Sequence, residues 1–510
     1  MADWSSSPPT APPPVGPPSA SGLRAGGAAY PAAPPEQWPA HAPSGPVPAA
    51  PGGPRGPYAP SPDGGPGAGR GGPVALTALA VVIVLALFIV GVGALVASSD
   101  GADDEATDTT IDLSDPEITA PPSEEPIDPQ MPTIPGFDPG FDPGGGVDPT
   151  ARARPLAEVL PELIAFVEET RQLQFVTDPV VQAVTDDEFE AKLAEDQTEQ
   201  NPDIEADAVA SIALGLLPTG FDVVAATEAL GAVSVFGFYD PETKELYVKG
   251  DQVTPFVQAV IAHELTHALD DQHFDLTKLD DLDERPDESA FAYLSLVEGT
   301  ASYVGDAYKA QLSPEDDAAY QAEEYAIGLE QLPSAMGLPP LLLVGGQVPY
   351  ASGQRFVQGL VDGGGMAAVD AAYADPPTTS EQILDPGAPA EGAVALTPPE
   401  APAGVEVVDE GAFGAVDLRL LELVSDPLSS LIDPNIGQIE PVPGFGGGRF
   451  VSWTDDGQSC IAFEAVGDDA AGSATIATAL DAWAGSAPGA DVGSRVGGSG
   501  IDVVTATRCA

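Results

Sequence analysis

The stretch 254–273, TPFVQAVIAHELTHALDDQH, constrains the fold of this chain more than any other. It predicts one helix, because Thr254 is a favourable N-cap residue and Pro255 suits the first helical position. Apolar residues cover a broad face of that helix, so we expect it to be buried. A buried helix that also carries histidines and a glutamate needs partners for those polar groups, and this need restricts what can pack around it.

His263, Glu264 and His267 form the motif His-Glu-Leu-Thr-His within that helix. The two histidines are four residues apart, so both imidazoles project from one face. Two neutral imidazoles are typical ligands of Zn²⁺, and Glu264 is placed to act as general base toward a water at an open position. The alternative is a core helix with hydrogen-bonded histidines and no metal. We favour zinc, because burying these groups together without a cation is costly.

A third ligand is expected from a second helix, predicted from about residue 288 to 311. Glu298 lies there in a stripe of apolar or small residues, where a buried carboxylate needs a cation or several donors. Gly299 beside it would permit a close approach of another backbone. We therefore favour Glu298 as the third zinc ligand.

His273 is the rival ligand, ten residues after His263. This spacing occurs in a pattern in which a glycine breaks the helix and returns the last histidine to the metal. Here Asp270 stands at the glycine position, and Asp adopts the left-handed conformation less readily than Gly. If His273 is not a ligand, we expect it to have a supporting or structural role, with Asp270, Asp271 or Gln272 orienting the ligand histidines.

Five segments, taken in order, carry a resemblance: 169–175 (ETRQLQF), 237–248 (GFYDPETKELYV), 263–274 (HELTHALDDQHF), 296–302 (LVEGTAS) and 376–386 (PPTTSEQILDP). They resemble thermolysin-like gluzincin zinc metallopeptidases and, more closely, a family of bacterial and archaeal HExxH metallopeptidases. The resemblance implies zinc bound by His263, His267 and Glu298, with Glu264 catalytic and a peptide or protein substrate.

Two positions depart from that family. Ser302 stands four positions after the Glu ligand, where gluzincins often have an acidic residue, and Asp385 stands where relatives tend to have a histidine. If that histidine assists catalysis, the alternative function is a catalytically silent zincin-fold scaffold or binding protein of the cell envelope. The intact Glu264 argues against this alternative, since a scaffold needs no general base.

A β-hairpin is predicted just before the active-site helix, from strands at 233–239 and 245–248. Such a hairpin either is purely structural or receives the substrate by β-augmentation, and the sequence leaves both open. A Tyr, His or Arg normally holds the oxyanion in this chemistry. The sequence offers three candidates without ranking them: Tyr303, Tyr308 and Arg355.

The first part of the chain is expected to lie outside the folded region. Residues 1–73 are a Pro/Gly-rich tail that we expect to be disordered. Residues 74–97 are apolar and uncharged, long enough for one transmembrane helix, and 98–151 form an acidic, Pro-rich linker. Arginines precede the span and acidic residues follow it, so we expect a single-pass cell-membrane protein with a cytoplasmic N-terminus and an extracellular C-terminal domain.

The remainder is predicted to be α+β: a helix-rich, zincin-like metallopeptidase domain with a small sheet at 152–395 and a small α+β module at 396–510. A capping box is predicted at Thr378 and Glu381. In the module, strands are expected at 449–453, 460–466 and 501–508, with a helix at 475–483.

The composition predicts a disulfide and excludes nucleic acid as a partner. Cys460 and Cys509 are the only two cysteines, and an even pair in an oxidising compartment predicts a disulfide, with two free buried thiols as the alternative. The formal net charge is −62, with 17 Lys and Arg against 79 Asp and Glu, so nucleic-acid binding is excluded. A saline habitat and a biased residue usage explain this acidity equally well.

Overall fold

The computed structural model of the chain describes residues 146–510, except 228–234, 284, 286, 336, 387–393, 426–436 and 499. These residues form a mixture of helices and sheets, which confirms the α+β class. The predicted tail at 1–73, the predicted span at 74–97 and most of the linker at 98–151 lie outside the described residues. Within the described ranges, no helix has the length and apolar character needed to cross a bilayer.

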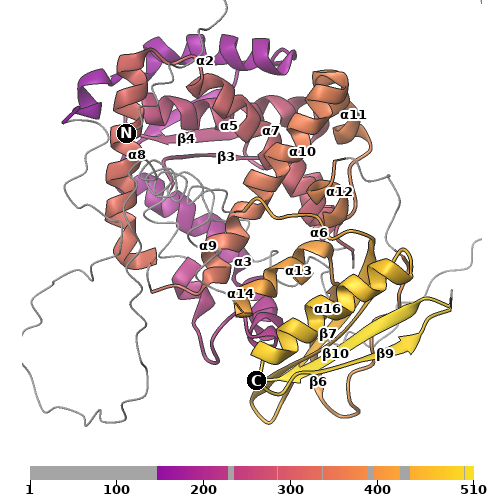
Figure 1. Cartoon of the computed structure of the whole chain (residues 1–510). Helices are drawn as coiled ribbons and strands as arrows, with labels where there is room; N and C mark the ends of the chain where they lie inside the picture. The colour runs from indigo at the N-terminus through magenta and orange to yellow at the C-terminus, as the bar shows by residue number, and fades with distance from the viewer. Residues whose placement is uncertain are drawn as a thin grey trace, which may run out of the picture. The chain divides into compact units, whose positions relative to one another are not determined.

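Helices dominate the part of the chain up to residue 384 (Figure 1). They are η2 (Pro149–Arg152), α2 (Leu156–Arg171), α3 (Asp186–Leu214), α5 (Pro255–Phe274), α6 (Lys278–Asp283), α7 (Ser289–Lys309), α8 (Pro314–Ala335), α9 (Pro340–Val344), η3 (Gly345–Gln347), α10 (Val348–Gly364), α11 (Met366–Ala374) and α12 (Ser380–Leu384). Two small sheets accompany them. Strand β1 (Arg154–Pro155) pairs with β5 (Gln252–Val253), and β2 (Val180–Val184), β4 (Glu245–Lys249) and β3 (Gly237–Asp240) form a sheet in that order.

Helix α5 begins as its sequence predicts. The Thr254 side chain accepts a hydrogen bond from the N–H of Val257 at 3.3 Å, and Pro255 follows at the first helical position. The helix is buried over most of its length and packs on α2, α7 and α8. Strands β3 and β4 lie beside it as an antiparallel hairpin (Figure 1), with Phe238 opposite Tyr247. The hairpin was predicted, but its first strand begins at Gly237 and not at 233.

Strand β2 is short and pairs parallel with β4. The residues before it bind the end of α5 instead. Gln272 accepts hydrogen bonds from the N–H groups of Val176 and Thr177 at 2.7 and 3.0 Å, and His273 lies 2.9 Å from the carbonyl oxygen of Gln174. These bonds occupy backbone groups that a longer strand would have used for its ladder.

Helices α7 and α10 cross in close contact because glycines face each other. A Cβ atom on Gly299 would lie 2.2 Å from the carbonyl carbon of Gly353, and one on Gly353 would lie 2.0 Å from the carbonyl oxygen of Ser295. No larger residue fits either position without moving a helix. The prediction that Gly299 permits a close backbone approach is therefore confirmed.

A five-stranded antiparallel sheet, drawn in yellow and orange in Figure 1, forms the C-terminal region with one long helix against it. Its order is β6 (Glu406–Ala412), β7 (Phe445–Asp455), β8 (Gln458–Gly467), β10 (Asp502–Cys509) and β9 (Asp491–Val496). The helices are α13 (Ala415–Leu420), α14 (Glu422–Ser425) and α16 (Ala470–Ser486). The predicted strands correspond to β7, β8 and β10, whereas the two edge strands were not predicted. Cys460 and Cys509 are bonded across β8 and β10, which confirms the disulfide.

Side chains of this sheet region complete the C-terminal end of α3. Arg508 donates to the carbonyl oxygens of Ile212 and Ala213 at 3.2 and 2.5 Å, and the indole of Trp483 donates to that of Leu214 at 2.8 Å. The carbonyl oxygen of Ile212 also accepts from the N–H of the C-cap residue Gly215 at 3.0 Å. The carbonyl groups of Ala213 and Leu214 lie at the helix end, where partners within the helix are missing, and these side-chain donors replace them. The division into 152–395 and 396–510 remains a prediction.

A second junction lies at the start of α7. The buried carboxylate of Glu288 accepts a hydrogen bond from the N–H of Ser380 at 3.2 Å, and the Ser380 hydroxyl accepts one from the N–H of Val416 at 3.2 Å. Helix α12 starts one residue later than its predicted capping box: Thr379 pairs with Gln382, rather than Thr378 with Glu381. Both pairs have the same spacing, so local sequence alone does not separate them.

Candidate metal centre

Three side chains converge between α5 and α7. His263 and His267 project from one face of α5, as their spacing predicts, and Glu298 comes from α7. The Nε2 atoms of the two histidines are 3.1 Å apart, and Oε2 of Glu298 lies 3.2 Å from the first and 3.4 Å from the second. The group is largely buried and could hold a metal ion.

The three separations fit the edges of a coordination tetrahedron. Metal bonds of roughly 2.0–2.1 Å at tetrahedral angles place neighbouring ligand atoms about 3.3 Å apart. The observed values of 3.1, 3.2 and 3.4 Å lie around this figure. The two imidazole nitrogens and the carboxylate oxygen therefore have the mutual spacing that the ligands of one divalent cation require.

The pKa values of His267 and Glu298 depend on two opposing effects, burial and the attraction between the two side chains. Burial opposes the charged form of both His267 and Glu298. The interaction between the two outweighs burial, so the imidazoles hold the pKa of Glu298 well below its usual range, and Glu298 raises the pKa of His267. Glu298 is thus ionised beside the imidazoles, which is the charge state that a carboxylate needs in order to bind a metal.

Glu264 lies beside the group and is almost fully buried. Its Oε2 accepts a hydrogen bond of 3.0 Å from the backbone N–H of Tyr239 in β3. Burial raises the pKa of Glu264 above its ordinary value, against the opposing effect of His263 and His267. A carboxylate with a raised pKa accepts a proton more readily, which suits a general base.

Tyr350 on α10 is a residue that the sequence analysis missed. Its ring stacks near His263, with centroids 6.2 Å apart and planes inclined by 24°. The side chain is buried, and its hydroxyl has no hydrogen-bond partner among the described residues. It precedes Gly353 by about one helical turn, so the close crossing of α7 and α10 brings it to the metal group. No sequence motif around Tyr350 predicts its contact with His263.

The three oxyanion candidates named from the sequence are engaged differently. Tyr308 donates its hydroxyl to Gln258 at 2.9 Å, and Arg355 donates to the carbonyl oxygens of Leu384 and Ile439. Tyr303 is half-buried and packs against the two largest hydrophobic clusters. Tyr308 and Arg355 therefore have structural roles in this conformation.

His273 lies outside the group of three. Helix α5 continues unbroken to Phe274, so the chain does not reverse at Asp270 as the rival pattern would require. Ten residues along a helix correspond to roughly 15 Å of rise, which separates the His273 ring from His263. Its Nε2 atom contacts the carbonyl oxygen of Gln174 instead.

Asp270 and Asp271 bind partners on two other elements. Asp270 forms a buried ion pair of 2.8 Å with Arg171 of α2 and accepts a hydrogen bond of 3.0 Å from Tyr373 of α11. Asp271 accepts from Tyr239 at 2.5 Å and pairs with Lys244 at 2.7 Å. Neither contacts the ligand histidines by a hydrogen bond among those of the described residues, so both hold α5 in place.

The two departures from the family pattern also lie outside the group. Ser302 is on α7, one turn after Glu298, and is half-buried. Asp385 directly follows α12 and is exposed. Neither belongs to the three residues that could bind the metal.

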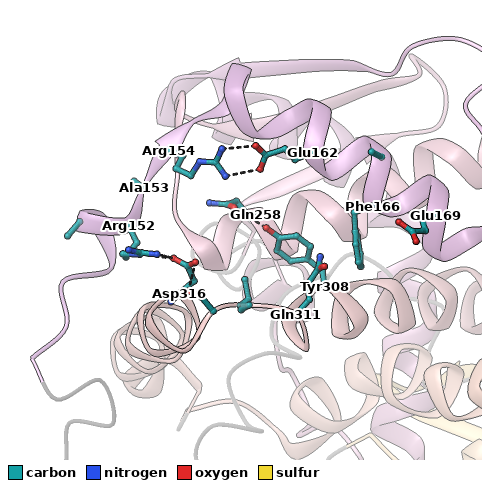
Figure 2. Close-up of a pocket in the computed structure, with 14 residues that line it drawn as sticks. Arg152, Ala153, Arg154, Glu162, Phe166, Glu169, Gln258, Tyr308, Gln311 and Asp316 are labelled. Carbon is teal, nitrogen blue, oxygen red and sulfur yellow. Dashed lines mark hydrogen bonds and ion pairs between the residues drawn. The ribbon is translucent and has the colours of Figure 1, made fainter.

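A cavity of about 720 Å³ lies elsewhere, between the segment 151–154, α2 and the loop that joins α7 to α8 (Figure 2). Four of its five charged side chains pair with one another: Arg154 binds Glu162 at 2.8 and 2.9 Å, and Arg152 binds Asp316 at 2.6 Å. None of the three candidate ligands lines it. We assign it no ligand.

Comparisons of the chain with protein families, with curated proteins and with solved structures found no match. The case for a function therefore depends on the residues and their geometry.

Proposed function

We propose that the chain is a membrane-anchored zinc metallopeptidase, with zinc on His263, His267 and Glu298. One observation carries this proposal: two imidazole nitrogens and a carboxylate oxygen converge at tetrahedral spacing beside a further buried carboxylate, that of Glu264. Two histidines and one carboxylate, with a fourth position open, are the donor set typical of catalytic zinc.

When bound, zinc would supply a Lewis acid and a water of lowered pKa. Glu264 would take the proton of the attacking water and return it to the leaving amine. The N–H of Tyr239 engages Oε2 of that carboxylate, and Oε1 has no hydrogen bond among the described residues. The free oxygen is the one we assign to the proton transfer.

Tyr350 is our candidate for stabilising the negative charge that develops on the scissile carbonyl oxygen. Burial keeps the pKa of its phenol well above the ordinary value, so the hydroxyl remains a donor. The negative charges of Glu298 and Glu264 raise the pKa of this phenol further. A donor of this kind contributes roughly 10²–10³ in kcat.

An extended peptide or protein chain is the proposed substrate. Strand β3 stands at the end of the sheet order β2-β4-β3, and its residue Tyr239 contacts Glu264. Peptides add to such edges through main-chain hydrogen bonds. A peptide paired along β3 would pass beside the general base.

The membrane anchor at 74–97 and the outward orientation belong to the same proposal and derive from the sequence alone. Protease added to intact cells should release the C-terminal region and leave the tail at 1–73 protected. Protection of the C-terminal region would reverse the orientation.

Metal analysis and a peptide-library digest of the purified full-length chain test the activity. We expect about one zinc per chain and cleavage of peptides. Glu264→Gln should keep the zinc and lose cleavage, whereas Tyr350→Phe should keep the zinc and lower kcat by roughly 10²-fold or more. Zinc without cleavage in the unaltered chain would favour the silent scaffold, and no zinc would overturn the proposal.

A further inference from the structure

Tyr239 of strand β3 contacts helix α5 at two residues, the proposed general base Glu264 and Asp271. We propose that Tyr239 is a positioning residue: its phenol, bound to Asp271, fixes strand β3 so that its own backbone N–H stays on Glu264. The catalytic consequence of this inference rests on the proposed function. The positioning itself does not, and the experiment below separates the two.

The two contacts span two turns of α5. The N–H of Tyr239 donates to Oε2 of Glu264 at 3.0 Å, and its hydroxyl donates to Oδ2 of Asp271 at 2.5 Å. Glu264 and Asp271 are seven residues apart, which places them on one face of the helix, about 10 Å apart along its axis. One tyrosine therefore holds α5 at two points, and the strand cannot slide along the helix without breaking one of them.

Asp271 is itself firmly held. Its Oδ2 pairs with Nζ of Lys244 at 2.7 Å, and its Oδ1 accepts from the N–H of Leu276 at 2.9 Å. Lys244 sits in the turn between β3 and β4 with a left-handed φ of 61°, and its N–H donates to the carbonyl oxygen of Asp240. Both the strand and the turn of this hairpin are thus fastened to one buried carboxylate.

Strand β3 needs such a fastening because it is an edge strand. Among the described residues it pairs with β4 alone, so no second strand holds its other edge. Gly237 also lies close to the base, since a Cβ there would be 3.8 Å from Cγ of Glu264. A slip of one residue would present a different backbone group to the carboxylate.

Two tyrosine-to-phenylalanine variants of the zinc-loaded full-length chain test this. Tyr239→Phe removes the hydroxyl that binds Asp271 and keeps the ring. Tyr247→Phe is the matched control: Tyr247 lies on neighbouring β4, and its hydroxyl binds Glu245. The measurements are amide hydrogen exchange over residues 236–240, zinc content, and kcat and KM for the best-cleaved peptide of the library.

We expect Tyr239→Phe to accelerate exchange in β3 about tenfold, as the loss of one hydrogen bond should. We expect kcat to fall roughly tenfold or more, with KM within about twofold and zinc unchanged, because a misplaced base impairs chemistry rather than binding. Tyr247→Phe should change none of these. Asp271→Ala, which removes the acceptor from the helix side, should reproduce the faster exchange if Tyr239→Phe folds poorly.

Unchanged β3 exchange in Tyr239→Phe, or equal acceleration in Tyr247→Phe, would refute the positioning role. Faster exchange with unchanged kcat would refute its catalytic consequence. If the unaltered chain cleaves no peptide while the exchange difference appears, the positioning stands and the proposed peptidase activity fails.

Discussion

The helix pair α5 and α7 and the five-stranded C-terminal sheet bury very different groups. Between the helices, Glu264, His267 and Glu298 are each at most 8% exposed, among apolar neighbours. The inner strands of the sheet bury mainly apolar side chains, such as Phe450 and Phe463. Apolar groups are stabilised by burial alone, whereas buried charged groups need compensation by partners or a cation. This contrast is the reason why we assign the proposed chemistry to the helix pair rather than to the sheet.

Loss of a metal ligand should have the largest effect. Glu298→Ala removes one of three protein ligands and should abolish most zinc binding, and with it any cleavage. His273→Ala removes a ring that contacts Gln174 and should keep the metal, with affinity lowered by at most roughly 10–100-fold. Zinc stoichiometry of the two purified variants measures this. Normal zinc in Glu298→Ala together with loss in His273→Ala would instead make His273 the ligand.

The disulfide should matter for stability and not for the metal. Cys460 and Cys509 are 49 positions apart, and removing a cross-link that closes such a loop costs roughly 4 kcal/mol in the chain-entropy account. The double variant Cys460→Ala/Cys509→Ala should therefore unfold at lower urea concentration while keeping its zinc. Parallel loss of zinc would show that the two regions are not independent.

Glu288, at the junction between them, should make stability depend on pH. Burial raises its pKa from 4.5 to about 7, against the hydrogen bonds from Ser380. As the pH rises, Glu288 therefore ionises at a lower pH in the unfolded chain than in the folded one. Its contribution to the free energy of unfolding is complete below pH 4.5 and is lost as the pH rises to about 7. The difference corresponds to about 3 kcal/mol.

Glu288→Gln should flatten this slope in urea unfolding measured between pH 4.5 and 8, because Gln carries no charge and its Oε1 can still accept from Ser380. Glu190→Gln, at an exposed position of α3, is the control and should keep the slope. An unaltered slope in Glu288→Gln would assign the pH dependence to other groups.

A substitution at the crossing of α7 and α10 should have the smallest effect on the free energy of unfolding, and this effect should be local. Gly353→Ala places a methyl group 2.0 Å from the carbonyl oxygen of Ser295, and overpacking of this kind costs typically 1–3 kcal/mol. Gly363→Ala on the same helix meets no atom within 4 Å and should be neutral or slightly stabilising. Urea unfolding of both variants measures the difference. Equal stabilities would mean that α10 adapts without strain.

Sequence reasoning reached the parts of this molecule that depend on local spacing. The placement of His263 and His267 follows from helical periodicity, and Glu298 was suggested by a carboxylate within an apolar stripe and by the resemblance. Tyr350 was out of reach, because its contact with His263 depends on how closely Gly299 and Gly353 let two distant helices approach.

The missed strands have a related cause. Strands β6 and β9 are the two edges of the C-terminal sheet, and β9 is exposed at nearly every position. Such strands lack the alternation of apolar and polar residues that reveals a strand with one buried face. Their pairing is set by β7 and β10, which lie elsewhere in the sequence.

The end of α3 has a consequence for the order of events during synthesis. Arg508 caps a carbonyl group 296 positions earlier in the chain. At about 5–20 residues per second, a ribosome needs roughly 15–60 s to make that intervening stretch. For this interval the carbonyl groups of Ala213 and Leu214 lack their side-chain donors, whereas the N–H of Gly215 already bonds to Ile212 and Ser211. A translation stop before Trp483 would leave those two carbonyl groups without these donors permanently. We expect a nascent chain to present this turn to chaperones until translation has passed residue 508.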